Sequence, residues 1–138
     1  EVGEGVLVLA ADTIVVVDGR VLGKPADLGE SRNMLARLQG RRHEVLTGVA
    51  LRWSGRTASA VERTEVCFRP LTPGEVAAYA ATGEGMDKAG SYAIQGRGAL
   101  LVSGIDGDYF NVVGLPLCRL GMLLESVGLS LERLWSGL

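Results

Sequence analysis

The chain has 138 residues, of which 47 % are hydrophobic and 22 % charged, and its formal net charge is −2. This length suits one domain with a buried core, and the sequence predicts neither a membrane span nor a signal peptide. The acidic balance argues against a polynucleotide partner, which requires a basic face, whereas a small phosphorylated ligand needs only a few converging cations. Two cysteines, Cys67 and Cys118, are too few for a disulfide framework and indicate reduced core residues of a cytoplasmic protein.

The hydrophobic pattern alternates between strands and helices, with no internal repeat or linker. In chain order it predicts strands at 6–10, 14–17 and 20–22, a helix at 27–38, strands at 45–53 and 61–69, a helix at 72–82, a strand at 99–105 and a helix at 116–127. The near-continuous apolar run at 6–10 is typical of a strand covered on both faces. Capping-box spacings at Asp27–Glu30 and Thr72–Glu75 mark the first two helix starts. The pattern therefore predicts a single α/β domain.

Asp12 is the most informative polar residue, because it separates the apolar segments at 6–10 and 14–17. An unpaired carboxylate buried there would cost several kcal/mol, so Asp12 either lies at an opening or meets a partner. Lys24 lies between Gly23 and Pro25 in a stiffened loop, where it either presents a point charge to a phosphate or is an ordinary exposed turn lysine.

The other polar candidates allow the same two interpretations. Lys88 and Gln95 lie in glycine-rich segments, where backbone can approach a ligand and the Gln95 amide offers both a donor and an acceptor. Asp106, Asp108 and Asn111 either ligate magnesium or cap local turns, and turn chemistry is favoured for at least two of them. The single histidine, His43, is interpreted as a strand-edge residue rather than a catalytic base.

Taken together and in order, six blocks between about residues 9 and 124 resemble the Maf family of nucleoside triphosphate pyrophosphatases. The blocks are Ala-Ala-Asp12-Thr13-Ile-Val-Val, Leu22-Gly-Lys24-Pro, the stretch from His43 to Val49, Asp87-Lys88-Ala-Gly-Ser-Tyr, Ile94-Gln95-Gly, and Gly107-Asp-Tyr-Phe-Asn111-Val-Val-Gly-Leu-Pro116. Each block by itself is weak evidence for the family, but the occurrence of all six in this order is specific to it.

The resemblance implies an α/β fold with a mixed sheet, flanking helices and a deep cleft, similar to inosine-triphosphate pyrophosphatases. It implies a cytoplasmic enzyme, a homodimer in many members, that uses magnesium or manganese to cut a nucleoside triphosphate into monophosphate and pyrophosphate. Asp12 would be the general base and metal neighbour, and Lys24 and Lys88 would bind substrate. Thr13 and Gln95 would influence base choice, and the block around Gln95 is similar to the branch that prefers dTTP and UTP.

Residues 1–138 contain neither the strand nor the Ser-Pro-Arg-Arg loop with which the family begins, so the sequence predicts a single Maf-like domain truncated at its amino end. Two alternatives to the enzyme follow. One is a nucleotide-binding regulator of septum formation and cell division without significant turnover. The other is a structural fragment whose exposed sheet edge is prone to association.

Overall fold

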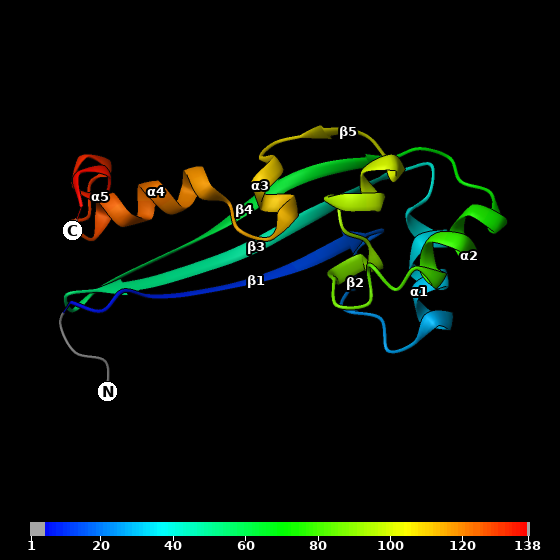
Figure 1. Cartoon of the computed structure of the whole chain (residues 1–138), viewed down its shortest axis with the longest axis horizontal. Helices are drawn as coiled ribbons and strands as arrows, with labels where there is room; N and C mark the ends of the chain where they lie inside the picture. The colour runs from blue at the N-terminus through cyan, green and yellow to red at the C-terminus, as the bar shows by residue number, and fades with distance from the viewer. Residues whose placement is uncertain (1–4, 138) are drawn as a thin grey trace.

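The structure, a computed structural model, describes residues 5–137 and has the expected α/β class (Figure 1). Its elements are β1 (Val8–Val17), β2 (Arg20–Leu22), α1 (Leu28–Leu38), β3 (Arg42–Trp53), β4 (Arg56–Phe68), α2 (Pro73–Ala81), η1 (Ala89–Ser91), η2 (Gly96–Leu101), β5 (Val102–Asp106), α3 (Tyr109–Val113), α4 (Leu117–Ser126) and α5 (Leu131–Ser136). Asp27 and Thr72 cap α1 and α2 as predicted, each accepting the backbone N–H of the glutamate three residues later.

The strands form one sheet in the order β2-β1-β3-β4-β5, and every pairing in the described part of the chain is antiparallel. Strands β3 and β4 make a long hairpin, here called the arm, which extends away from α1 and α2 with β1 running beside it (Figure 1). Strand β1 pairs with β3 from Val8 to Val16, but β2 pairs with only Val15 to Val17 on the other side. Within residues 5–137, the stretch 8–14 therefore has a free edge.

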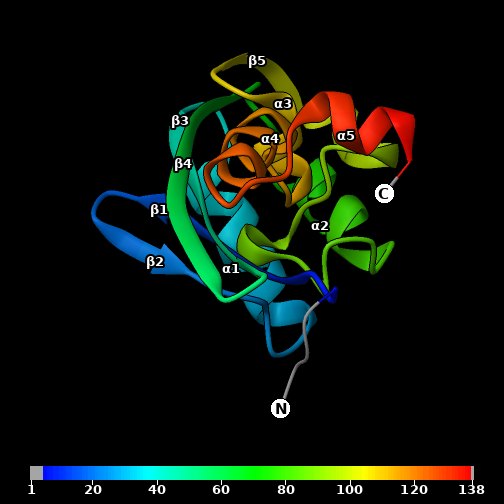
Figure 2. The same cartoon turned by 90° about the vertical axis from the view of Figure 1, so that its left-hand side faces the viewer.

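Helices cover one face of this sheet (Figure 2). In β3 the odd-numbered residues from His43 to Leu51 are buried, whereas the even-numbered ones on the other face are partly or fully exposed. Two apolar clusters lie on the covered face. One packs β-strand ends against α1 and α2 around Leu35 and Phe68. The other packs the arm against α4 around Val49 and Leu129.

Three sequence expectations are corrected by the structure. The stretch 6–10 is not covered on both faces, since Val6 is 52 % exposed and Leu9 41 %. The strand expected at 99–105 begins only at Val102, because the preceding residues form the 3-10 helix η2. Cys118 is exposed rather than in the core, and both cysteines are free thiols. Among the residues described, no helix has the length and apolar character needed to cross a membrane.

Candidate active site

A cavity of about 190 Å³ opens where β1 and β3 pass beneath the segment that carries α3. Its walls include Ala11, Asp12, Thr13, Val15 and Val45 from the strands, Lys24, Asp87, Lys88, Ala89 and Tyr92 from two loops, and Val112, Val113 and Gly114 from the end of α3. Sites that enclose a whole drug-sized ligand are usually about 300–1,000 Å³, so this cavity has room for only part of a ligand of that size.

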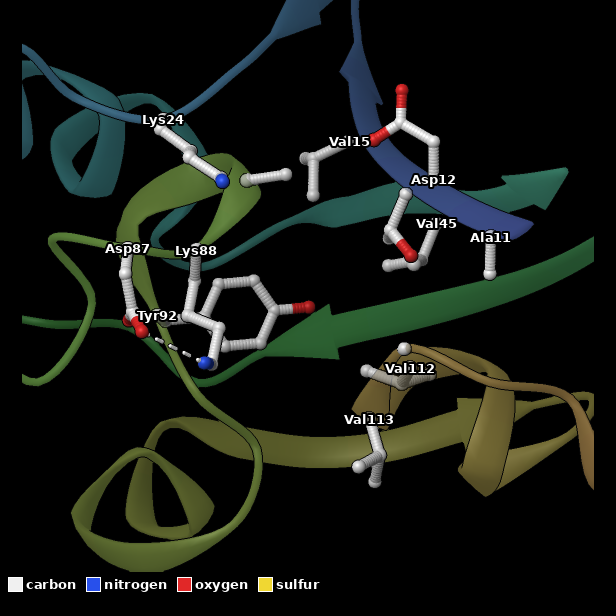
Figure 3. A pocket seen from close by; sticks show the side chains of 13 residues that line it. Ala11, Asp12, Val15, Lys24, Val45, Asp87, Lys88, Tyr92, Val112 and Val113 are labelled. Atoms are coloured by element: carbon white, nitrogen blue, oxygen red, sulfur yellow. Dashed lines mark hydrogen bonds and ion pairs between the residues drawn. The ribbon is translucent and has the colours of Figure 1, made fainter. Parts of the chain in front are cut away.

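Two lysines enter the cavity from the loop side, opposite β1 (Figure 3). Lys24 follows β2, and Lys88 precedes η1. The ammonium group of Lys88 lies 3.3 Å from the carboxylate of Asp87, and both side chains are solvent-exposed enough to exchange this partner for a ligand. The loop can press against the sheet because residue 90 is a glycine with φ of +74°, and a Cβ there would lie 2.9 Å from a Val15 methyl carbon.

Asp12 lies at the rim of the cavity, in the stretch of β1 with the free edge. Because side chains alternate along a strand, its carboxylate projects to the opposite face of the sheet from Thr13, and Figure 3 shows it pointing away from Tyr92 and Val112. Asp12 also borders a shallow apolar hollow on that other face, with Ala10 and Gly48. The sequence left two possibilities for this carboxylate, an opening or a partner, and its exposed side chain agrees with the first.

A buried polar network lies behind the cavity wall. The hydroxyl oxygen of Thr13 is 2.8 Å from that of Thr47, and Thr47 donates to the backbone carbonyl of Asn111 at 3.3 Å. The Asn111 amide donates to the carbonyls of Val45 and Glu62, at 3.1 and 3.2 Å. Since Val112 and Val113 follow Asn111 directly, the network ties one cavity wall to the other. Sequence reasoning weighed Asn111 as a metal ligand or turn cap and did not find this role.

His43 is not a strand-edge residue, because it is only 3 % exposed inside β3 and its Nε2 lies 2.7 Å from the Tyr92 hydroxyl oxygen. Burial lowers the pKa of His43 to about 4, so the ring is neutral near pH 7. Burial likewise raises the pKa of Tyr92. With Phe68 the two rings form an edge-to-face cluster that supports the cavity wall at Tyr92.

Glu84 organises the loop that carries Lys88. Its carboxylate accepts hydrogen bonds from the hydroxyl of Tyr79 at 2.9 Å and from the backbone N–H groups of Arg97 and Gly98, at 3.1 and 2.9 Å. Burial acts to raise the pKa of Glu84, but these hydrogen bonds outweigh it and leave the pKa below its ordinary value. Both ends of the segment 84–98 are thereby held together.

The remaining candidates lie elsewhere. Gln95 is exposed at the start of η2 and is not among the residues that line the cavity, so its part in base choice stays a prediction. Asp108 caps α3 by accepting the N–H of Phe110 at 2.7 Å, as turn chemistry predicts. Asp106 ends β5, away from the cavity.

Oxygen donors for a divalent cation are few. Within residues 5–137 no group of three or more histidine, cysteine, aspartate or glutamate side chains is placed to hold a metal ion. Asp12 and Asp87 nevertheless line the same cavity. Magnesium is commonly bound by one or two carboxylates together with substrate phosphates, so a single carboxylate at the rim, that of Asp12, suits a metal that arrives with a phosphorylated ligand.

The fold and the cavity define an α/β protein with a small site lined by a strand aspartate and two loop lysines, and comparison with known proteins identifies the family. Residues 1–127 match the family model described as Maf-like protein. The chain therefore belongs to the Maf-like protein family.

Curated relatives share more than half of the aligned residues. The chain is 59 % identical over 124 residues to a dTTP/UTP pyrophosphatase of Moorella thermoacetica, covering 88 % of this chain and 64 % of that protein. It is 57 % identical over 124 residues to the one from Symbiobacterium thermophilum (90 % and 64 %) and 56 % identical over 127 residues to the one from Halalkalibacterium halodurans (92 % and 67 %). The chain thus spans about two thirds of the length of these relatives.

Proposed function

We propose that this chain carries the catalytic cavity of a nucleoside triphosphate pyrophosphatase acting on dTTP and UTP. The observation that carries the proposal is the 59 % identity to a relative named dTTP/UTP pyrophosphatase, in a chain whose cavity brings Asp12, Lys24 and Lys88 together. The same names favour turnover over the alternative of a regulator of cell division that binds nucleotide without cutting it.

In the proposed reaction, a water oxygen bonds to the α-phosphorus while the bond from that phosphorus to the α,β-bridging oxygen breaks. The products are the monophosphate and pyrophosphate. Asp12 orients the water and takes its proton; because its exposed carboxylate points outward at the rim, the attacking water and the α-phosphate are placed at the rim, beside the free edge of β1, rather than inside the cavity. Lys24 and Lys88 neutralise phosphate oxygens of the leaving pyrophosphate.

A divalent cation, magnesium or manganese, would be held by Asp12 together with the phosphates, and would supply further charge neutralisation. The cavity holds two lysines and two aspartates, which leaves no net positive charge to balance a triphosphate. Additional positive charge is therefore needed for tight binding, and the cation provides part of it.

The test is to identify both the products and the bond that is cut. The purified protein, supplied with dTTP, magnesium and ¹⁸O-labelled water, should release dTMP and pyrophosphate, with the label in dTMP. Label in the pyrophosphate would place the attack at the β-phosphorus. Release of orthophosphate and dTDP would place it at the γ-phosphorus, and either result would overturn the proposal.

A further inference from the structure

In the polar network behind the cavity, the donor and acceptor capacity of each group limits where the hydroxyl hydrogens can lie. A threonine hydroxyl has one hydrogen to donate, whereas a backbone carbonyl can only accept. Thr47 is fully buried, and two oxygens lie within its reach: the carbonyl of Asn111 at 3.3 Å and the hydroxyl of Thr13 at 2.8 Å.

Only one arrangement of hydrogens satisfies both contacts. If Thr47 donates to the Asn111 carbonyl, its oxygen is free to accept from Thr13, and both pairs have a hydrogen between them. In the reverse arrangement Thr47 donates to Thr13, and two buried oxygens face each other at the Asn111 contact without a hydrogen. The Asn111 carbonyl also accepts the Gly114 N–H at 3.1 Å, so the reverse arrangement leaves no group unbonded but sets the lone pairs of two buried oxygens against each other. The first arrangement is favoured because it places a hydrogen between these two oxygens.

The consequence appears at Thr13, which lines the cavity. Its only hydroxyl hydrogen is directed inward to Thr47, so the oxygen offers lone pairs to a bound molecule. We infer that Thr47 is a positioning residue that makes Thr13 an obligate hydrogen-bond acceptor, so that the cavity selects nucleotides presenting an N–H or O–H group at this point. The identity of the ligand as a nucleotide rests on the proposed function.

Two groups of a pyrimidine nucleotide have this chemistry. Uracil and thymine carry an N–H between their two carbonyls, whereas cytosine has an acceptor nitrogen at that position. The 3′-hydroxyl of the sugar is also a donor, and a 3′-fluoro group is not. The inference thus accounts for a site that accepts dTTP and UTP alike, and the two sources are separable by substrate analogues.

The first experiment locates the hydrogen without any need for turnover. Neutron diffraction from crystals grown in deuterated solvent should show deuterium on Thr47 Oγ1 directed to the Asn111 carbonyl, and deuterium on Thr13 Oγ1 directed to Thr47. Deuterium on Thr47 directed to Thr13 would overturn the inference. This result is independent of whether the protein cleaves triphosphates.

The second experiment compares kcat/KM for UTP, CTP and 3′-fluoro UTP in three variants. Thr47→Val removes the inward acceptor and frees the Thr13 hydrogen, so one discrimination, UTP over CTP or UTP over its 3′-fluoro analogue, should weaken by about tenfold. Which ratio changes identifies the base or the sugar as the donor. Thr47→Ser keeps the hydroxyl and should restore the native ratio.

Thr64→Val is the matched control, because Thr64 is equally buried in the neighbouring strand and donates to the Asp108 carbonyl, away from Thr13. Thr64 also accepts from the Asn111 amide, which keeps the carbonyls of Val45 and Glu62 as acceptors in this variant. Thr64→Val should lower stability to a similar extent and leave both ratios unchanged.

Unchanged ratios in Thr47→Val, with UTP still cleaved, would overturn the inference while the proposed function stands. Absence of triphosphate cleavage in the native protein would overturn the proposed function instead, and the neutron result would still decide the direction of the hydrogen bonds.

Discussion

Asp12 and Thr13, which are adjacent in β1, project to opposite faces of the sheet. Thr13 faces the cavity and the buried network, whereas Asp12 faces away and remains exposed at the rim. In the part of the chain that the structure describes, no hydrogen bond or ion pair holds the Asp12 carboxylate. A group exposed in this way contributes little to stability and is available for chemistry.

Asp12→Asn should therefore separate activity from folding. The amide keeps the shape of the side chain but cannot take a proton, so turnover of dTTP should fall at least ~100-fold, the lower range for a general base. The unfolding midpoint in urea should not change. Asp87→Asn is the comparison, since this second cavity carboxylate is expected to affect phosphate binding rather than proton transfer. Near-native turnover in Asp12→Asn would move the base to Asp87, the other carboxylate that lines the cavity.

His43 links pH to stability through its lowered pKa. Between its ordinary value of 6.5 and the folded-state value of about 4, the unfolded chain binds a proton that the folded protein does not. Stability should therefore fall as the pH decreases through this window, by about 3 kcal/mol in total. Urea unfolding followed from pH 7 to pH 4 measures this slope. His43→Gln removes the titrating ring, and an equally steep slope in that variant would assign the pH dependence to other groups.

At the scale of elements, one carboxylate makes several of the hydrogen bonds that hold the segment 84–98, beside those between Ser91 and Ser31 of α1 and from the Ala93 N–H to the Tyr79 hydroxyl. Glu84 receives three donors, two from the start of η2 and one from Tyr79 at the end of α2. The segment carries Asp87, Lys88 and Tyr92, so the Glu84 clamp helps to fix a large part of the cavity wall.

Glu84→Gln should loosen the segment. One carboxylate oxygen becomes an NH₂ group that faces donors, so we expect a loss of about 1–3 kcal/mol in the free energy of unfolding and a raised KM for dTTP. Glu75→Gln is the control, because Glu75 accepts only the Thr72 N–H in a capping box, where glutamine is an accepted replacement. Equal effects of the two substitutions would show that the Glu84 clamp has no special role.

The sequence predicted those elements whose signals are local. The starts of α1 and α2 depend on side chains within three residues of one another, and both were predicted from their caps. The exposure of 6–10 was not predictable, because an apolar run does not say which neighbours cover it. The contacts of Asn111 were missed for the same reason, since it bonds to residues 45, 62 and 64, which only the tertiary fold brings near.

At the scale of the whole molecule, a polar layer separates the two apolar clusters. Thr47 lies between Val45 and Val49 on one strand face, and these two valines belong to different clusters. Thr64 and Asn111 extend the buried polar layer across the sheet. Since polar contacts contribute less to cohesion than continuous apolar packing, the arm with α4 is expected to open independently of the part that contains α1 and α2.

Two leucines of equal burial test this division. Leu129 and Leu35 are both 0 % exposed, but Leu129 belongs to the cluster under the arm and Leu35 to the cluster at α1. Replacing either with alanine should cost about 2–5 kcal/mol by creating a cavity. In native-state hydrogen exchange, Leu129→Ala should reduce protection chiefly in residues 49–60 of the arm, whereas Leu35→Ala should reduce it around residues 15–17 and 43–46. If both variants lower protection equally along the whole sheet, the two clusters unfold as one cooperative unit and the polar layer does not divide them.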